Sequence, residues 1–329
     1  MKVYPNAKDV QMTENLMGAL EDYREWRQFN VDTYIKEKIK KLNDYLESCN
    51  LNSVVVAVSG GIDSALVLSL VKKAQEVKGS PIKNIYPVLL PSSEGVSFQS
   101  EATERGREVC ESLELQPIVV EMLPIVESIR QGLESQSPIK TDDWAVGQLV
   151  SYARTPVLYY MTSLISANDG SGILCGTTNM DEGAYLGYVG KASDGMVDVQ
   201  LISDLHKSEV YKVSAALKVP ESIMNTKPSG DMYDARYDED VFGAPYDFVE
   251  LYLYYLSMGK NERKIWESYY LKTNEDRQSF SSFKQNLDKL HAHNAHKYKV
   301  GSPAFYLDLE SLIYFNKKEL GWGIEINEE

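Results

Sequence analysis

A short segment near residue 60 constrains the fold of this chain most strongly. The sequence VVVAVSGGIDSALV, residues 54–67, joins a run of β-branched residues to a glycine turn and then to a helical pattern. Residues 54–58 are apolar at every position, which is typical of a strand that is covered on both faces. Such a parallel strand reaches its neighbour through a crossover connection, usually a helix. The segment therefore predicts a parallel sheet, with the glycine turn at the carboxyl end of one strand.

The rest of the chain continues this alternation of strands and helices. Further short apolar strands are predicted at residues 85–90, 118–120 and 173–175. Helices are predicted at residues 31–48, 65–73, 101–113, 208–217 and 154–165, the last of them buried. The fold class is therefore predicted to be α/β, with an open, mainly parallel twisted sheet and helices on both faces. We expect an N-terminal arm at residues 1–30, a single domain at 31–305 and a C-terminal extension at 306–329.

Composition and charge argue against several classes of function. The net charge of the 329 residues is −14, whereas extended nucleic-acid binding needs a basic surface. No apolar run is long enough to cross a membrane, and residues 1–9 contain no signal-peptide core. Cys49, Cys110 and Cys175 form no metal-binding spacing, so we expect reduced cysteines in a cytoplasmic protein.

Two other segments leave alternatives open. The sequence HAHNAHKYK contains His291, His293 and His296, but no Cys or acidic partner stands at ligand spacing. A solvated helix end is therefore the preferred interpretation, and a zinc site the alternative. Residues 245–270 are rich in tyrosine and place several apolar residues on one helical face, which predicts a core helix or else a subunit interface.

The glycine turn has the composition of a phosphate-binding loop. Gly60 and Gly61 let backbone N–H groups converge on a ligand, and the following helix contributes its positive end. Ser59 and Ser64 add hydroxyl donors. No Gly-Lys-Ser/Thr follows, so this is not the usual nucleotide P-loop. Asp63 would repel a phosphate unless a cation lay between them, and Mg²⁺ typically binds one or two carboxylates together with phosphate oxygens. The turn therefore predicts a magnesium–phosphate site.

The hexapeptide SGGIDS resembles the pyrophosphate-binding loop of the PP-loop ATP pyrophosphatases, which have an adenine nucleotide α-hydrolase-like fold. Three later segments are similar to NAD synthetases, in the same order: GTTNMDEGAYLGYVGKASDGMVDVQLISDLHKSEVYKVSAALKVPESI, KPSGDMYDARYDEDVFGAPYD and HKYKVGSP. The resemblance covers about residues 31–305. It implies an ATP-dependent ligase that adenylylates nicotinic acid adenine dinucleotide (deamido-NAD). Ammonia then displaces AMP, which gives NAD, and Mg²⁺ is the implied cofactor.

The resemblance also implies roles for individual residues. The catalytic residues would be Asp63, Glu182 and Lys207, with Mg²⁺ bound by Asp63 and Glu182. ATP would be bound by Ser59, Gly60, Gly61, Asp63, Ser64, Thr177, Lys207 and Ser229. Deamido-NAD would be bound by Arg154, Lys191, Asp198, His296 and Lys297. The residues by themselves leave other interpretations open: a helix-start glutamate at 182, surface lysines at 191 and 207, and a structural salt bridge at Arg154.

The chain departs from the family pattern mostly near the acceptor substrate. Pro156 stands where the Ala-Arg-x-Arg pattern has its second arginine, and one residue is inserted between Glu182 and Lys191. Adenylyl transfer is therefore better supported than the identity of the acceptor. The alternatives are a PP-loop ligase for a different carboxylate and a catalytically inactive nucleotide-binding homologue. The combination of Asp63, Glu182 and Lys207 argues against the inactive homologue, and a tRNA-modifying enzyme fits the acidic composition poorly.

The expected partners are ATP, deamido-NAD and ammonia, without nucleic acid or membrane. Members of the family that use glutamine carry a large glutaminase domain before the phosphate loop, and residues 1–58 are too short for one. We therefore expect free ammonia, or ammonia from a separate glutaminase, as the nitrogen source. The resemblance further implies a homodimer, with the dinucleotide site across the subunit interface.

Overall fold

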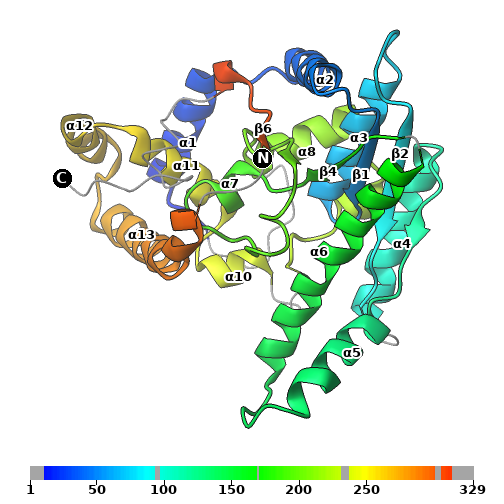
Figure 1. Cartoon of the computed structure of the whole chain (residues 1–329). Helices are drawn as coiled ribbons and strands as arrows, with labels where there is room; N and C mark the ends of the chain where they lie inside the picture. Colours follow the sequence, from blue (N-terminus) through cyan, green and yellow to red (C-terminus); the bar gives the residue numbers. More distant parts are fainter. Residues whose placement is uncertain (1–10, 93–96, 169, 231–236, 301–304, 313–329) are drawn as a thin grey trace.

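A computed structural model describes residues 11–92, 97–168, 170–230, 237–300 and 305–312 (Figure 1). Within these ranges, six strands form one parallel sheet in the order β3-β2-β1-β4-β5-β6. They are β1 (Ser53–Ala57), β2 (Asn84–Leu89), β3 (Ile118–Val119), β4 (Gly172–Gly176), β5 (Val199–Gln200) and β6 (Phe305–Tyr306). The strand order reverses between β1 and β4. Ligands of open α/β sheets bind at such a switch point, beyond the carboxyl ends of the strands.

Helices cover both faces of the sheet, as the sequence predicts. Val54 and Val56 of β1 join the large core cluster that contains α3 (Ile62–Gln75). Val55 points to the opposite face, where it packs with Leu158 and Ile165 of α6 (Asp143–Ala167). This alternation explains why every residue of the strand is apolar, because both of its faces are buried.

The other helices complete the two layers and a helical lobe. Next to α3 lie α2 (Val31–Ser48) and α8 (Lys207–Ala216). The remaining helices are α1 (Glu14–Arg27), α4 (Ser97–Ser112), α5 (Leu123–Glu134), α7 (Met180–Gly183), α9 (Glu221–Met224), α10 (Asp238–Phe242), α11 (Tyr246–Ser257), α12 (Lys260–Tyr270) and α13 (Asn274–Asn294). Two short 3-10 helices follow, η1 (Ala295–Val300) and η2 (Glu310–Leu312). α1, α11, α12 and α13 lie together on the side of the molecule away from β2 (Figure 1).

Both ends of the described chain differ from the expected arm and extension. Residues 14–27 form the regular helix α1, whose Leu16, Leu20 and Tyr23 are fully buried in the main core. Beyond residue 305, β6 adds an edge strand, and Leu307 and Leu309 are buried after it. The described parts of both segments therefore pack into the core of the domain. Residues 1–10 and 313–329 lie outside the described ranges.

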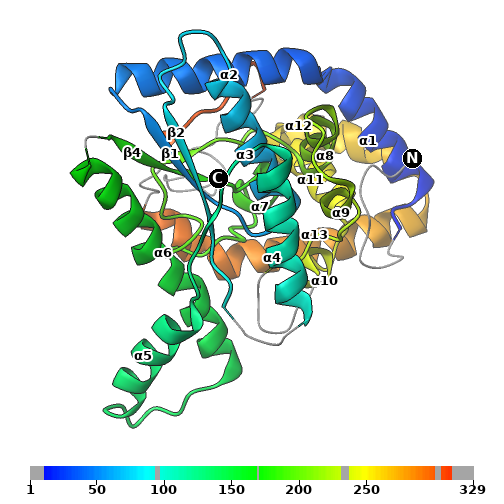
Figure 2. The same ribbon diagram turned by 90° about the vertical axis from the view of Figure 1, so that its right-hand side faces the viewer.

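α6 is longer and less buried than predicted. It begins at Asp143, eleven residues before the predicted start, and together with α5 it projects from the body (Figures 1 and 2). One face of α6 is exposed and carries Tyr152, Pro156, Tyr160 and Leu164, one residue in every four. Its apolar composition predicted burial within the chain, but this stripe faces solvent because the hairpin reaches beyond the sheet.

The first half of the tyrosine-rich segment, α11, is part of the core, as the sequence predicts, whereas α12 is mostly exposed. Phe248, Tyr252 and Tyr255 of α11 are buried and pack their rings against Phe280 of α13. All three cysteines are free thiols. None of the helices in the described ranges has the length and apolarity needed to cross a membrane.

Candidate active site

The turn after β1 folds back onto the first turn of α3. The backbone N–H of Ser59 donates to Oγ of Ser64 (3.2 Å), and the two hydroxyl oxygens lie 3.1 Å apart. Gly61 is the N-cap of α3 and donates its N–H to Oγ of Ser59 (3.2 Å). A helix start without a side-chain cap leaves backbone donors available for an anion. The geometry therefore suits the phosphate binding that the sequence predicts for this turn.

Gly60 has a conformation and surroundings that require glycine. Its φ is +80°, in the left-handed region, and an added Cβ would lie 2.0 Å from the carbonyl oxygen of Ala102 in α4. Arg105, also in α4, donates from Nε to the carbonyl oxygen of Gly60 (3.1 Å). Close packing against α4 thus fixes the shape of the turn.

Lys207 lies between the two carboxylates that the sequence predicts as metal ligands. Its Nζ donates to Oδ2 of Asp63 (2.7 Å) and to Oε1 of Glu182 (3.0 Å). The lysine side chain is 2% exposed, which excludes a solvated surface lysine. Burial disfavours its charge, but the carboxylates of Asp63 and Glu182 raise the pKa of Lys207 well above its usual value. The ammonium is therefore a fixed positive charge at the carboxyl ends of β1 and β4.

Two residues that the sequence did not single out complete this cluster. Asn179 donates from Nδ2 to Oδ1 of Asp63 (2.9 Å) and to Oε1 of Glu182 (2.7 Å), and its Oδ1 caps α7. An asparagine just before two acidic residues is an N-cap signal that could have identified it. The hydroxyl of Tyr246 lies 3.0 Å from Oε1 of Glu182. No local pattern marks Tyr246, because its contact depends on the packing of α11.

The cluster contains three buried or partly buried carboxyl groups and one ammonium group. Asp238 is buried beside Tyr246, which donates to its Oδ2 (2.8 Å), while its buried Oδ1 has no hydrogen-bond partner in the described part of the chain. Burial raises the pKa of Asp238, and it raises the pKa of Glu182 to about 8, although nearby Lys207 opposes both shifts. A further cation at this site would favour the ionised form of these carboxyl groups.

These residues fit a magnesium site that is completed by phosphate. Asp63 and Glu182 supply the hard oxygen ligands that Mg²⁺ prefers. Among the described residues, no group of three metal-ligating side chains is placed to hold a metal by itself. Mg²⁺ usually takes one or two carboxylates and fills its shell with water and phosphate oxygens, so a pair of carboxylates next to a phosphate loop is sufficient.

The residues predicted to bind the dinucleotide fall into separate groups. Lys191 and Lys297 both lie near His296, and partial desolvation together with these charges lowers the pKa of the imidazole. Lys297 also donates from Nζ to the carbonyl oxygen of Gly187 (2.9 Å). The three side chains form a cationic group suited to an anion. The neighbouring His291 is buried and stacked on Tyr185, so a solvated helix end does not describe this part of the histidine segment.

Arg154 and Asp198 lie near the sheet rather than in this cationic group. Arg154 lines a pocket with Ser59 and Leu90, beside the phosphate turn. Asp198 accepts a hydrogen bond from the backbone N–H of Leu174 in β4 (2.7 Å), so one of its carboxylate oxygens is bound to the sheet. Their roles toward a dinucleotide remain predictions.

The other two predicted ATP ligands, Thr177 and Ser229, lie in the connections that follow β4 and α9. Thr177 is half-buried in the connection between β4 and α7, one residue after the strand ends. Ser229 pairs with Tyr237 in an isolated antiparallel bridge. Residues 231–236 between them lie outside the described ranges, and the roles of both ligands remain predictions.

The sequence of this chain is similar to sequences of known proteins. A family model described as NAD synthase matches residues 34–300. The NH(3)-dependent NAD(+) synthetase of Thermoplasma acidophilum is 32% identical over 64% of this chain and 80% of its own length. The enzyme of the same name from Pyrococcus horikoshii is 30% identical over 68% of this chain and 80% of its own length.

Solved structures show the same fold. An NMN synthetase from Francisella tularensis superposes with a TM-score of 0.60 at 24% identity, covering 76% of this chain and 97% of its own. An NH3-dependent NAD synthetase from Campylobacter jejuni gives 0.58 at 21% identity, covering 82% and 96%. The family model spans the phosphate turn, the Asp63–Lys207–Glu182 cluster and the cationic group, and the chain therefore belongs to the NAD synthase family.

Proposed function

We propose that this chain is an ammonia-dependent NAD synthetase, a carbon–nitrogen ligase. It would use ATP and ammonia to amidate deamido-NAD, giving NAD, AMP and pyrophosphate through an adenylylated intermediate. The observation that carries the proposal is the buried ion-pair cluster of Asp63, Lys207 and Glu182 beside the phosphate turn. Such a cluster would neutralise and hold a departing pyrophosphate.

The chain's own groups would act by positioning and by charge. The turn at Ser59–Ser64 and the N-terminus of α3 would bind the ATP phosphates, with the α-phosphorus presented to the substrate carboxylate. Lys207 would stabilise the charge that develops on the leaving pyrophosphate. Mg²⁺ held by Asp63 and Glu182 would supply further charge neutralisation. No covalent enzyme intermediate is needed.

The acceptor would be recognised mainly by charge. Lys191, His296 and Lys297 offer positive or hydrogen-bonding groups to the phosphates of a dinucleotide. Arg154 lies beside the turn, where a substrate carboxylate would meet the α-phosphorus. These placements support an anionic acceptor, and they suit either a dinucleotide or a smaller nucleotide.

We also propose that the chain forms a homodimer through α6. The exposed stripe of Tyr152, Pro156, Tyr160 and Leu164 continues the apolar exposure of Trp144 near the start of the helix. A row of large apolar side chains on a projecting helix is typical of an interface rather than of a free surface.

The three free thiols suit a cytoplasmic protein, because cysteines stay reduced in the cytoplasm.

A direct assay tests the reaction. The purified protein is incubated with ATP, Mg²⁺, ammonium and deamido-NAD, and AMP and NAD are measured in parallel. Equal amounts of AMP and NAD are expected, and both should vanish when deamido-NAD is omitted. If neither product forms while the folded protein still binds Mg–ATP, the chain is a nucleotide-binding homologue instead.

A second assay tests a different acceptor substrate. It is motivated by Pro156, which replaces an expected arginine, and by one structural neighbour, which is an NMN synthetase. In this reaction nicotinic acid mononucleotide replaces deamido-NAD, and NMN is measured. A higher kcat/KM with the mononucleotide would assign the chain to that acceptor, with the same adenylyl-transfer chemistry.

A further inference from the structure

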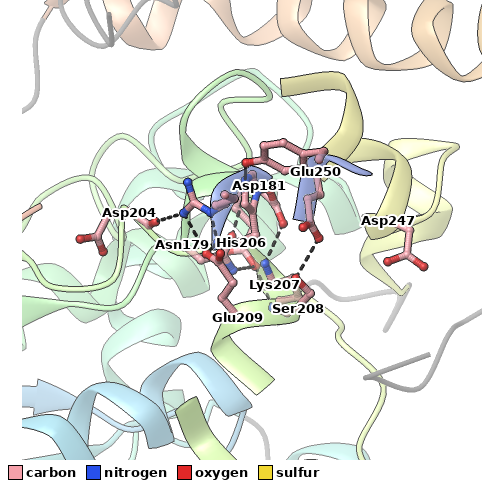
Figure 3. Close-up of polar contacts among 12 residues, drawn as sticks. Asn179, Asp181, Asp204, His206, Lys207, Ser208, Glu209, Asp247 and Glu250 are labelled. Atoms are coloured by element: carbon pink, nitrogen blue, oxygen red, sulfur yellow. Dashed lines mark hydrogen bonds and ion pairs between the residues drawn. The ribbon is translucent and has the colours of Figure 1, made fainter. Parts of the chain in front are cut away.

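A buried carboxylate links the two elements that carry Glu182 and Lys207. Asp181 precedes Glu182 in α7, and its Oδ2 accepts the backbone N–H of Lys207 at the start of α8 (2.7 Å). Its Oδ1 lies 2.6 Å from Nδ1 of His206 (Figure 3). Asp181 and His206 are both 0% exposed, so neither contact competes with water. One side chain therefore fixes the distance between the two catalytic elements.

His206 connects Asp181 to helix α1. Its Nε2 lies 2.7 Å from the hydroxyl of Tyr23, which is also buried. Burial lowers the pKa of His206 to about 4, so the ring is neutral near pH 7. A neutral ring with its proton on Nδ1 donates to Asp181 and accepts from Tyr23, which satisfies all three groups.

Two arginines of α1 hold the residues on the other side of Lys207. Arg27 pairs with Glu209 (2.6 Å), whose Oε2 caps α8 by accepting the N–H of His206 (3.0 Å). Arg24 pairs with Glu250 (2.6 Å), and Glu250 in turn accepts from Oγ of Ser208. Figure 3 shows His206, Ser208, Glu209 and Glu250 around the start of α8.

Positions 206, 208 and 209 are thus tied to α1, directly or through one residue, whereas the side chain of Lys207 points to Asp63 and Glu182. α1 (Glu14–Arg27) lies before residue 34, where the match to the family model begins. The contact set therefore includes a helix that lies outside the residues matched by the family model. Catalytic groups lose much of their effect when they are displaced by about 1 Å, so such supporting contacts matter for rate.

We propose that Tyr23, Arg24 and Arg27, named here the α1 clamp, position Lys207 through its neighbours. Tyr23 acts through His206 and Asp181, Arg27 through Glu209, and Arg24 through Glu250 and Ser208. The clamp holds the first turn of α8 and the start of α7 in one arrangement, so that the ammonium meets the departing pyrophosphate. These residues are positioning residues and do not touch substrate. The proposal rests on the proposed function for its kinetic consequence, but its structural consequence is independent of it.

The test uses two tyrosine variants, each of which removes one hydroxyl that forms a hydrogen bond between α1 and another helix. Tyr23→Phe breaks the contact with His206, whereas the control Tyr270→Phe breaks a bond to Asp22 on α1 that does not involve α8. We expect Tyr23→Phe to lower kcat for AMP formation about tenfold, with KM for deamido-NAD changed less than about twofold. Tyr270→Phe should stay within about twofold of the wild type in both constants. Equal kinetic effects of the two variants would overturn the proposal.

His206 offers a rescue experiment in the same assay. His206→Ala removes the donor to Asp181, while His206→Asn places an amide N–H near the position of Nδ1. The asparagine variant should regain at least part of the kcat that the alanine variant loses. Equal kcat values for the two variants, with equal thermal unfolding, would contradict a positioning role.

Hydrogen exchange separates failure of the clamp from failure of the proposed function. The backbone N–H of Lys207 is bound to Asp181, and its exchange is measurable in the full-length protein without substrate. Tyr23→Phe should accelerate exchange at residues 206–209 about tenfold relative to Tyr270→Phe. Unchanged exchange would reject the clamp whatever the enzyme activity. Accelerated exchange in a protein that makes no AMP would keep the clamp and reject the proposed function.

Discussion

At the scale of single residues, the site depends on a few side chains whose charge or shape allows no substitute. Lys207 is fully enclosed between Asp63 and Glu182, and Gly60 sits where a side chain would meet α4. Such positions combine high burial with a specific contact, and they are where single substitutions have the largest expected effects.

Asp63→Asn tests the predicted metal ligand. The amide cannot replace a charged magnesium ligand, so we expect AMP formation to fall by a factor of at least about a hundred. Circular dichroism should show an intact fold, because the turn and the end of β1 keep their other contacts. Wild-type AMP formation in this variant would remove Asp63 from the metal site.

Gly60→Ala and Gly61→Ala form a matched pair within the turn. At Gly60 the new Cβ has a φ of +80° and meets Ala102, whereas at Gly61 the nearest atom is Oγ of Ser59 at 3.3 Å. We expect Gly60→Ala to lower the free energy of unfolding by about 2 kcal/mol and to weaken Mg–ATP binding. Gly61→Ala should have a smaller effect on both. Urea unfolding and calorimetry measure the two quantities, and similar losses at both positions would contradict the steric argument.

Lys297→Ala tests the cationic group. Lys297 lies beside Lys191 and His296, and its hydrogen bond goes to Gly187 rather than to the Asp63 cluster. We therefore expect KM for deamido-NAD to rise about tenfold while KM for ATP changes little. Lys289→Ala, at an exposed position of α13, is the control. Equal increases of both KM values would place Lys297 elsewhere.

At the scale of elements, hydrogen bonds at one helix start join two helices that are far apart in the sequence. Asp276 in the first turn of α13 accepts from Oγ1 of Thr13 (2.6 Å), Nδ2 of Asn15 (2.9 Å) and the N–H of Thr273 (2.7 Å). One carboxylate thereby caps α13 and ties it to the start of α1. Burial raises the pKa of Asp276, but the hydrogen bonds from Thr13 and Thr273 lower it more, and the net shift is downward.

Asp276→Asn should therefore destabilise the fold in a pH-dependent way. A carboxyl whose pKa is lower in the folded state stabilises above its unfolded pKa of about 3.9, and this contribution is lost as pH falls further. We expect a loss of about 2 kcal/mol in the free energy of unfolding at pH 7 and a smaller loss at pH 3.5. Asp44→Asn, at an exposed position of α2, is the control. An equal loss at both pH values would show that the charge of Asp276 is not the cause.

At the scale of the whole molecule, the projecting α5–α6 hairpin carries an apolar stripe that this chain does not cover. The hairpin extends beyond the body of the molecule (Figures 1 and 2). Its exposed apolar stripe contrasts with the closed core around α3 and α11. Burying this stripe against a second copy would remove apolar surface from water, which is the usual driving force of association.

Tyr160→Glu tests the proposed dimer against a matched control. Tyr160 on α6 and Tyr269 on α12 are 64% and 61% exposed, so both substitutions place a charge on an open surface. Sedimentation of the wild type should show a dimer that Tyr160→Glu weakens at least about tenfold, because a buried charge is costly at an interface. Tyr269→Glu should leave the association unchanged. A monomeric wild type, or equal behaviour of the two variants, would contradict the proposal.

The sequence by itself predicted much of the local structure of this protein and indicated which residues form its candidate active site. The strand before the turn and the helix at residues 31–48 were predicted correctly, because β-branched runs and helical apolar spacing are signals within a few residues. The resemblance to a family indicated Asp63, Glu182 and Lys207, and the structure places all three in contact.

The tertiary structure alone decided how that site is closed and supported. Asn179 reaches Asp63 across 116 residues, Tyr246 reaches Glu182 across 64, and Tyr23 reaches His206 across 183. No local pattern encodes such contacts, because they depend on how helices pack after the sheet has formed. For the same reason, the sequence alone does not show that α1 packs into the core or that one face of α6 is exposed. Burial is a property of the whole packed molecule, and a sequence pattern shows only which residues favour it.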